Sequence, residues 1–425
     1  MLNRTIAPDI HPISSLSLTP PRLRTLTNNV PMFLFDNPQL DLIHFIIQVR
    51  AGILYETEKH TAQFSYGLLK ESSSCHSSTE TADLLAFYGV HLTTSVTLDK
   101  ISIQLSIPKS HIADILPLIA DFIIHPTFRE ANLDKYKNLK IKDLEYNAQK
   151  TEVQATRQML HAMFGNEVTA GRFSTKENLQ AVTLQQMYDF HHKTMCAERV
   201  NLFVTGNLDA DLESFIANQF DQIPHGKAAP ELPYFTLPTL PDARIQILMP
   251  NSVQTSITLC QPMFGYENSE RRGFSILSTI LGGYFGSRLM QSLREQHGYT
   301  YGVSSGSVYF GRQSLFIIDS NVNANDWSSA LDACRTELEL LQRELVPTEE
   351  LENVRNYIVG DLIRDVENSV SYMKKYAFWN YYGFNEGEMQ TCMDCALNIS
   401  DSELLLLAKK HLNYNKFTQV IVGKI

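Results

Sequence analysis

A glycine-rich run over residues 281–306 contains the residue types best suited to chemistry in this chain of 425 residues. Its pattern predicts a turn, then a helix from Ser287 that ends at Gly298, and then a strand. Arg294 falls in the last turn of that helix and Tyr301 at the start of the strand, so both side chains can face one region. An arginine presents a planar fork of donors to a carboxylate or peptide carbonyl, and a tyrosine hydroxyl can donate to a developing oxyanion. The structural alternative is that Arg294 caps helix carbonyls and Tyr301 is a core residue.

Two halves of similar length must position this run. The stretch from Asp221 to Ala243 contains five prolines. It is unsuited to regular helix or to a central strand, because proline lacks the backbone N–H donor. It also lies near the middle of the chain, where an interdomain linker is expected. We therefore predict an N-terminal domain over residues 1–224, a linker over 225–242 and a C-terminal domain over 243–425.

The two halves repeat one order of sequence patterns. Each has an apolar run, two alternating runs with a short connection, long helical patterns and a closing apolar run. These strand-like runs are 42–49, 90–97, 100–107 and 200–207, and then 256–263, 300–310, 313–322 and 417–425. Neighbouring alternating strands with short connections favour antiparallel pairing, and the helices predict a sheet covered on one face. The predicted fold class is α+β, with two tandem homologous domains of mostly antiparallel sheet covered by helices.

The pattern LGGxxxSRLxxxLREQHGxxY over residues 281–301 resembles the C-terminal half of a known family. The family is that of the pitrilysin, insulinase and mitochondrial-processing-peptidase zinc metallopeptidases, and the likeness extends over nearly the whole chain. The resemblance implies that Arg294 and Tyr301 reach a catalytic cleft in the N-terminal half. There the family uses this pair to bind substrate and to help stabilise the tetrahedral intermediate.

The N-terminal half departs from the family at its zinc motif. Active members carry His-x-x-Glu-His and a glutamate about 76 residues later, which together supply three zinc ligands and the general base. The matching stretch here is 61–69, in which Gln63, Tyr66 and Gly67 take the positions of the first His, the Glu and the second His; Asp143 lies 76 residues after Gly67. A neutral amide is a poor ligand, glycine offers none, and a tyrosine with a pKa near 10 is no carboxylate base. We predict no metal site and no catalytic residues of its own in this chain.

Other histidines and cysteines do not rebuild a metal site by spacing. His191 and His192 end a helical pattern before Cys196, and adjacent helix residues point about 100° apart, so we interpret them as surface residues at a helix end. Cys392 and Cys395 form a CxxC in a pattern typical of a helix, which favours incidental cysteines over a zinc or redox site.

The resemblance leaves three functional hypotheses. The first is a non-catalytic subunit of a bacterial-type heterodimeric peptidase, which binds unfolded peptide and lends Arg294 and Tyr301 to a zinc site on its partner. Two such chains close like a clamshell, so the partner is a homologous zinc-motif subunit or a second copy of this chain, and the zinc belongs to the partner. The second is a scaffold or binding protein with no part in proteolysis, as in the structural members of the family. The third is an autonomous peptidase with a non-standard metal site.

Composition and charge limit the classes of partner and the cellular location that we expect. The formal net charge is −10 and the pI is near 5.7. Without a dense basic stripe, an acidic chain argues against nucleic acid as a partner. No apolar run reaches the roughly 18 residues of a membrane span, and the first 14 residues lack the apolar core of a secretory signal. Six scattered cysteines suit a reducing compartment, so we expect a cytoplasmic protein without a membrane partner.

Overall fold

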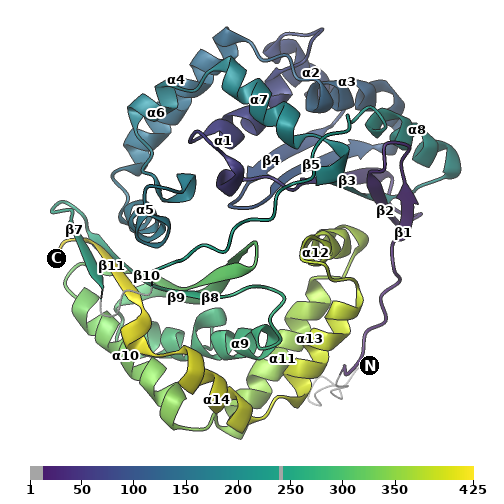
Figure 1. Cartoon of the computed structure of the whole chain (residues 1–425). Helices are drawn as coiled ribbons and strands as arrows, with labels where there is room; N and C mark the ends of the chain where they lie inside the picture. The colour runs from purple at the N-terminus through teal and green to yellow at the C-terminus, as the bar shows by residue number, and fades with distance from the viewer. Residues whose placement is uncertain (1–12, 239–242) are drawn as a thin grey trace, which may run out of the picture.

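The computed structural model describes residues 13–238 and 243–425. Residues 1–12, which hold most of the N-terminal stretch discussed above, and residues 239–242, the end of the predicted linker with Pro241, lie outside the described residues. Figure 1 shows two halves that face each other, each with a sheet and a set of helices on its outer side. This arrangement confirms the prediction of an α+β chain with two domains of one kind.

Each half contains one mixed sheet, and the two sheets share one strand order. The N-terminal sheet has the order β1-β2-β6-β3-β5-β4 and the C-terminal sheet the order β7-β11-β8-β10-β9. The pairs β2–β6 and β7–β11 are parallel and the other neighbours are antiparallel. From β2 onward the second sheet therefore repeats the first, as the repeated sequence pattern predicts. The strands are β1 (Arg22–Thr25), β2 (Pro31–Asp36), β3 (Leu42–Val49), β4 (His91–Val96), β5 (Ile101–Pro108), β6 (Val200–Gly206), β7 (Arg244–Leu248), β8 (Gln254–Phe264), β9 (Thr300–Phe310), β10 (Gln313–Asn323) and β11 (Thr418–Gly423).

The helices begin at local signals that the sequence carries. Ser77, Thr183 and Ser400 each accept a hydrogen bond from the backbone three residues on, in capping boxes that start α2, α7 and α14. The N-terminal half has α1 (Thr61–Gly67), α2 (Ser78–Phe87), α3 (Ile112–Ile124), α4 (Glu130–Asn147), α5 (Thr151–Phe164), α6 (Lys176–Gln180), α7 (Leu184–Thr194) and α8 (Ala210–Phe220). The C-terminal half has α9 (Arg271–Ser278), α10 (Trp327–Arg343), α11 (Thr348–Arg364), α12 (Ser369–Tyr381), α13 (Gly387–Asn398) and α14 (Asp401–His411), with the π-helical turns η6 (Thr279–Gly283) and η7 (Met290–Gln296).

The central strands of the N-terminal sheet are apolar on both faces. In β2, Met32 and Leu34 enter the core beneath the outer helices, whereas Phe33 and Phe35 enter a second core on the opposite face. Successive side chains of a strand point to opposite faces, so such a strand needs a cover on each side. The sequence pattern predicts one covered face, and the structure differs because both faces of these strands are apolar.

The second cover of each sheet is a helix from the other half. Helix α12 packs on β2, β3 and β6 through an apolar cluster that includes Tyr376 and Trp379, and α5 packs on β8 and β11 through Met159 and Phe164 (Figure 1). Gln48 of β3 also donates to the Ala377 carbonyl oxygen at 3.2 Å. This reciprocal exchange joins the halves through buried apolar surface, in addition to the connecting segment.

The β4–β5 turn anchors a second contact between the halves. The ammonium of Lys100 lies 4.8 Å from the ring centre of Phe378 and 4.9 Å from that of Tyr381, in the favourable position over an aromatic face. The Tyr381 hydroxyl donates to the Asp99 carbonyl oxygen at 2.7 Å, and the Asp99 carboxylate accepts from the Gly311 amide at 3.0 Å. The predicted tight connection at these two residues is therefore held by the C-terminal half.

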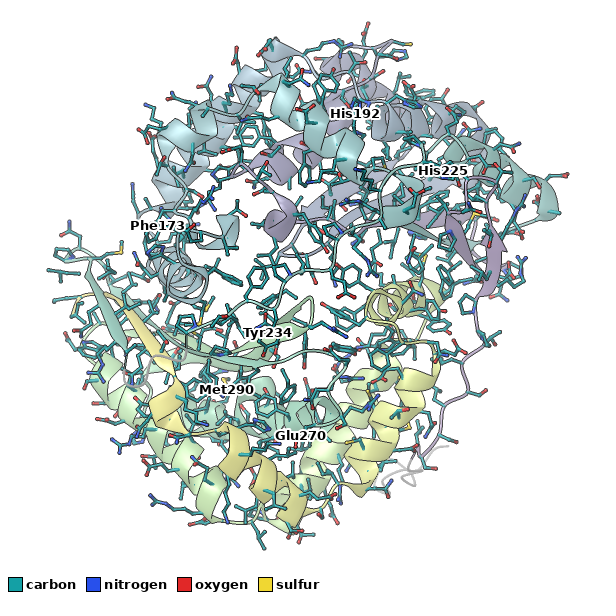
Figure 2. The ribbon with its side chains drawn as sticks, in the orientation of Figure 1. Phe173, His192, His225, Tyr234, Glu270 and Met290 are labelled. Atoms are coloured by element: carbon teal, nitrogen blue, oxygen red, sulfur yellow. The ribbon has the colours of Figure 1, made fainter. Side chains whose placement is uncertain are left out.

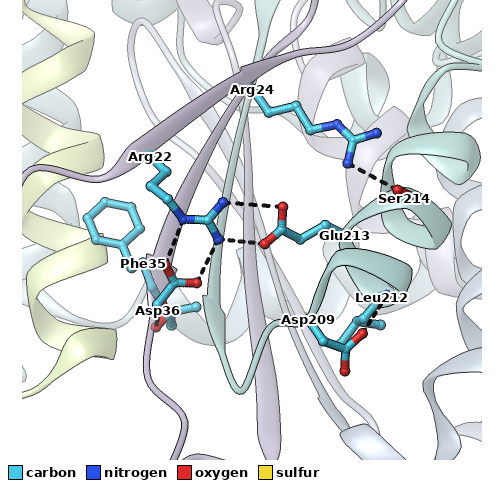
Figure 3. Close-up of polar contacts among 9 residues, drawn as sticks. Arg22, Arg24, Phe35, Asp36, Asp209, Leu212, Glu213 and Ser214 are labelled. Carbon is cyan, nitrogen blue, oxygen red and sulfur yellow. Dashed lines mark hydrogen bonds and ion pairs between the residues drawn. The ribbon is translucent and has the colours of Figure 1, made fainter.

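At the other end of the N-terminal sheet, an ion cluster holds the short outer strand. Arg22 of β1 donates to Asp36 of β2 at 2.7 and 2.8 Å and also pairs with Glu213 of α8 (Figure 3). Planar guanidinium and carboxylate groups match in this two-point geometry, which raises the pKa of Arg22 above its ordinary value through hydrogen bonds to Asp36 and then Glu213.

The segment between the halves runs without helix or strand through its described part. Tyr234 is exposed and lies where this segment passes between the halves (Figure 2), and the next residue, Phe235, exchanges two backbone hydrogen bonds with the Gln313 side chain. The absence of regular structure agrees with the proline-rich pattern. Among the described residues, no helix is long and apolar enough to cross a membrane.

Candidate functional site

The glycine-rich run folds into a helix and a strand, as its pattern predicts. The helix continues to Gln296 and ends at Gly298, whose φ of 65° lies in the left-handed region that favours glycine. Gly298 donates to the Arg294 carbonyl oxygen at 3.1 Å, and β9 begins two residues later. Arg294 thus lies in the last helical turn and Tyr301 at the second position of the strand.

Packing at the start of this helix fixes its position. Arg288 donates two hydrogen bonds of 2.8 Å to Glu350 of α11, and Leu289 and Leu293 are buried in the C-terminal core. The chain before the helix approaches β9 closely at Gly282, where an added Cβ would lie 2.9 Å from the Ser305 hydroxyl oxygen. The backbone that carries Arg294 is therefore held by buried contacts on both sides.

The side chains of Arg294 and Tyr301 extend from this rigid base toward solvent. Tyr301 is 88% exposed, which contradicts the alternative of a core tyrosine. The Arg294 guanidinium lies 4.6 Å from the ring centre of Phe285 and 3.4 Å from the Glu295 carboxylate, a weak exposed pair. Among the described residues, no hydrogen bond joins Arg294 to Tyr301. Both groups remain available to an external partner.

The degenerate zinc-motif stretch forms α1, which faces α4. Gln63 and Gly67 of α1 line a pocket of about 350 Å³ together with Tyr136 and Lys140 of α4. Asp143, one turn further along α4, accepts from Lys140 at 3.4 Å. The structure therefore brings the two helices of the predicted stretch together at one place.

Tyr66 does not join Gln63 and Gly67 in this pocket. Its side chain is fully buried against α7, and its hydroxyl contacts the Thr194 hydroxyl at 2.8 Å. Burial raises the pKa of Tyr66 further above its ordinary value, because the phenolate would lose its hydration. The position that the sequence resemblance aligns with the family's general base is here a core residue.

The side chains at α1 and α4 do not fit a zinc ion. Zinc sites use thiolate, imidazole and carboxylate ligands. The pocket has one imidazole, His60, and one carboxylate, Glu56. The rest of this place offers the Gln63 amide, a glycine and the Lys140 ammonium beside Asp143. Among residues 13–238 and 243–425, no group of three or more His, Cys, Asp or Glu side chains is arranged to hold a metal ion.

Three residues of this pocket have shifted pKa values, and no motif in the sequence marks them as site residues. Burial is the main cause in each: it raises the pKa of Glu56 to about 7, lowers that of His60 to about 4, and lowers that of Lys59. His60 is thus neutral at pH 7 and contacts the Asn178 amide oxygen at 3.0 Å. These residues precede α1 by a few positions, and only their burial distinguishes them from exposed loop residues.

Replacing Glu56 with glutamine is expected to change how stability depends on pH. In the unfolded chain the carboxyl ionises near pH 4.5, whereas in the folded chain it holds its proton to about pH 7. The folded state binds more protons between these values, so the wild type loses stability as pH rises through this window, by up to about 3 kcal/mol. Glu56→Gln lacks this titration. The Tm of the variant minus the Tm of the wild type, measured by scanning calorimetry, should therefore increase from pH 4.5 to pH 8. A constant Tm difference across that range would contradict the prediction.

Two smaller sequence interpretations have different outcomes. His191 is fully buried with its Nε2 2.9 Å from the Ile123 carbonyl oxygen, so its interpretation as a surface residue is wrong, whereas His192 is exposed (Figure 2). The helix ends at this place as predicted, but α7 packs against α3 at the His191 face. Cys392 and Cys395 lie in the predicted helix, and all six cysteines are free thiols.

Comparisons with known proteins agree with this architecture. Residues 33–175 match the family described as Insulinase (Peptidase family M16), and residues 181–358 match the one described as Peptidase M16 inactive domain. Together these matches span most of both halves. The chain belongs to peptidase family M16, which confirms the resemblance in residues 281–301.

Individual relatives are distant in sequence and similar in length. An uncharacterized zinc protease, YmxG, of Bacillus subtilis is 22% identical over 83% of this chain and 86% of its own length. A non-peptidase homolog, YmxG, of Helicobacter pylori is 22% identical over 93% of this chain and 92% of its own. The crystal structure of a peptidase M16 inactive domain from Pseudomonas fluorescens superposes with a TM-score of 0.87 at 21% identity, over 95% of this chain and 98% of that one. The fold of nearly the whole chain is therefore that of an M16 protein.

Proposed function

We propose that this chain is the non-catalytic subunit of a two-subunit zinc peptidase, which binds peptide substrate and contributes Arg294 and Tyr301 to a zinc site on its partner. The observation that carries the proposal is the contrast between two places in one chain. Arg294 and Tyr301 are held on a buried base and left free for a ligand, whereas α1 lacks the side chains for zinc. The name of the Helicobacter relative, a non-peptidase homolog, supports the same division of roles.

The partner in this proposal is a homologous chain with an intact His-x-x-Glu-His motif, which holds the zinc, and the two close as a clamshell around the peptide. A second copy of this chain would leave the complex without zinc ligands at either α1. Free thiols at all six cysteines support a cytoplasmic location, where disulfides are rare.

The direct test is to co-express the chain with a homologue that carries the zinc motif. We expect the two to co-purify, the complex to bind one zinc per heterodimer by elemental analysis, and peptide cleavage to require both chains. The isolated chain should contain no stoichiometric zinc. Zinc and cleavage in the isolated chain would instead support an autonomous peptidase.

A scaffold without a role in proteolysis is the second candidate. The observation that favours it is that α1 has been repacked, with Tyr66 in the core, so no trace of the catalytic base remains accessible. A scaffold predicts that the complex cleaves peptide equally well when Arg294 or Tyr301 is replaced. The same assay therefore distinguishes the two candidates.

A further inference from the structure

The pocket between α1 and α4 contains the aligned zinc-motif positions Gln63 and Gly67, and its other lining residues lie outside that motif. Its polar lining includes Glu56, Lys59, Gln63, Tyr136 and Lys140, and its apolar lining includes Ile53 and Val96. Its volume of about 350 Å³ is within the range of small-molecule pockets. An opening of this size with convergent polar groups is suited to a ligand of a few heavy atoms.

Tyr136 and Gly67 fit each other as a pair. A Cβ atom added to Gly67 would lie 2.3 Å from the Tyr136 hydroxyl oxygen, a separation that real Cβ atoms do not show. The tyrosine ring is held by an edge contact with Phe64, 5.0 Å between ring centres, so it cannot withdraw freely. The hydroxyl therefore takes the space of a side chain at position 67, and the loss of that side chain is what admits it to the pocket.

Glu56 brings an unsatisfied acceptor to the same pocket. One carboxylate oxygen, Oε1, accepts from the Ala62 amide at 2.7 Å and holds the start of α1. The other oxygen, Oε2, is buried and has no hydrogen-bond partner within residues 13–238 and 243–425, and the residue as a whole is 9% exposed. Buried polar atoms are rarely left without a partner, because the unmade hydrogen bond is costly. Because burial raises the pKa of Glu56 to about 7, this oxygen is a free acceptor above that pH, where an N–H group of a ligand would satisfy it.

The α4 side of the pocket offers donors. The Lys140 ammonium donates to Asp143 at 3.4 Å and lies 5.1 Å from the centre of the Tyr136 ring. Burial raises the pKa of Tyr136 to about 12, so its hydroxyl remains a donor at neutral pH. The Gln63 amide is exposed beside them. An ammonium, a hydroxyl and an amide directed at one small volume match an anionic oxygen group.

We infer that this pocket binds an α-carboxylate together with its adjoining N–H, as found in the C-terminal residue of a peptide or in a free amino acid. The carboxylate accepts from Lys140 and Tyr136, and the N–H donates to the unpartnered oxygen of Glu56. The inference needs no partner subunit and no metal. It assigns a ligand to the place where active relatives hold zinc.

The test uses the full chain alone in isothermal titration calorimetry at about pH 8, where the Glu56 carboxyl is ionised. The probes are N-acetyl-L-alanyl-L-alanine, its C-terminal amide, and L-alanine. We expect the free acid to bind and the amide to bind about tenfold more weakly, since it removes a charge-assisted hydrogen bond. If L-alanine binds as tightly as the acetylated dipeptide, the natural ligand is a free amino acid. If only the dipeptide binds, the natural ligand is the C-terminus of a peptide.

Two lysines on α4 provide the matched comparison. Lys140→Met should weaken binding of the acid about tenfold and remove the preference over the amide. Lys142→Met removes the same charge two residues away on an exposed face and should change neither. Gly67→Ala, which displaces the Tyr136 hydroxyl, should also weaken binding. An unchanged Tm for Lys140→Met would show that its weaker binding comes from the lost contact and not from misfolding. Equal binding of acid and amide, no binding of any probe, or equal effects of Lys140→Met and Lys142→Met would overturn the inference.

Discussion

Arg294→Ala is expected to lower peptide turnover by the complex with a zinc-motif partner about 10²- to 10³-fold, the range seen when one donor to a developing oxyanion is removed. The Tm of the chain should remain unchanged, because the polar and aromatic partners of the guanidinium in the described part of the chain are the exposed ring of Phe285 and the exposed Glu295. The loss should appear in kcat rather than in KM alone, since a donor to the tetrahedral intermediate acts mainly in the transition state. Tyr301→Phe, which removes only the hydroxyl, should reduce kcat in the same direction.

A matched control is Arg312→Ala. Arg312 is also an exposed arginine of the C-terminal half, with a distant carboxylate at 3.9 Å, and it lies at the opposite end of β9 from Tyr301. Its replacement should leave turnover unchanged. If Arg294→Ala retained wild-type turnover, the chain would not contribute to the partner's zinc site and the scaffold candidate would be favoured.

Glu388→Ala is expected to destabilise the folded chain by about 3–5 kcal/mol, the cost of leaving a buried charge without its partner. Glu388 is 3% exposed on α13 and pairs with Arg271 and Arg272 of α9, of which Arg271 is also buried. The same carboxylate accepts from the Cys392 thiol at 3.0 Å. Removing it strands the Arg271 guanidinium in the interior, where it lies over the ring of Tyr266. The measurement is the Tm of the isolated chain and its midpoint in urea.

The surface supplies the control for this prediction. Glu339 also bridges two arginines, Arg335 and Arg343, but in a solvent-exposed row on α10. Exposed ion pairs contribute little because water and salt screen them, so Glu339→Ala should leave the Tm almost unchanged. A loss of stability for Glu339→Ala as large as that for Glu388→Ala would show that burial is not the cause.

Local patterns predicted the elements well because their causes are local. The alternation of apolar and polar residues in 90–97 and 100–107 follows directly from the side-chain direction in a strand, and β4 and β5 form the expected hairpin. Gly298 ends its helix because a left-handed residue is needed there. Neither result depends on distant parts of the chain.

Prediction of the site was incomplete where distant residues decide the environment. The alignment of Gln63 and Gly67 with zinc-ligand positions drew attention to α1, but it did not reveal Tyr136 and Lys140, which lie some 70 residues later on α4 and line the same pocket. Nothing in the sequence around Glu56 marked it as a site residue, apart from its being a carboxylate. Its raised pKa results from burial, and burial is set by the packing of elements that are far apart in sequence.

The sequence by itself determined that α1 lacks zinc ligands and that Arg294 and Tyr301 stand at a helix end and a strand start. These features depend on residue types and on short spacings within a single helix or strand. Only the tertiary structure decided that α5 and α12 cover each other's sheets, that Tyr66 turns into the core, and that the Tyr136 hydroxyl occupies the space beside Gly67. Such contacts depend on how elements that are far apart in the sequence pack together. The pattern of a strand shows that a face is apolar, but it does not specify which helix will bury that face.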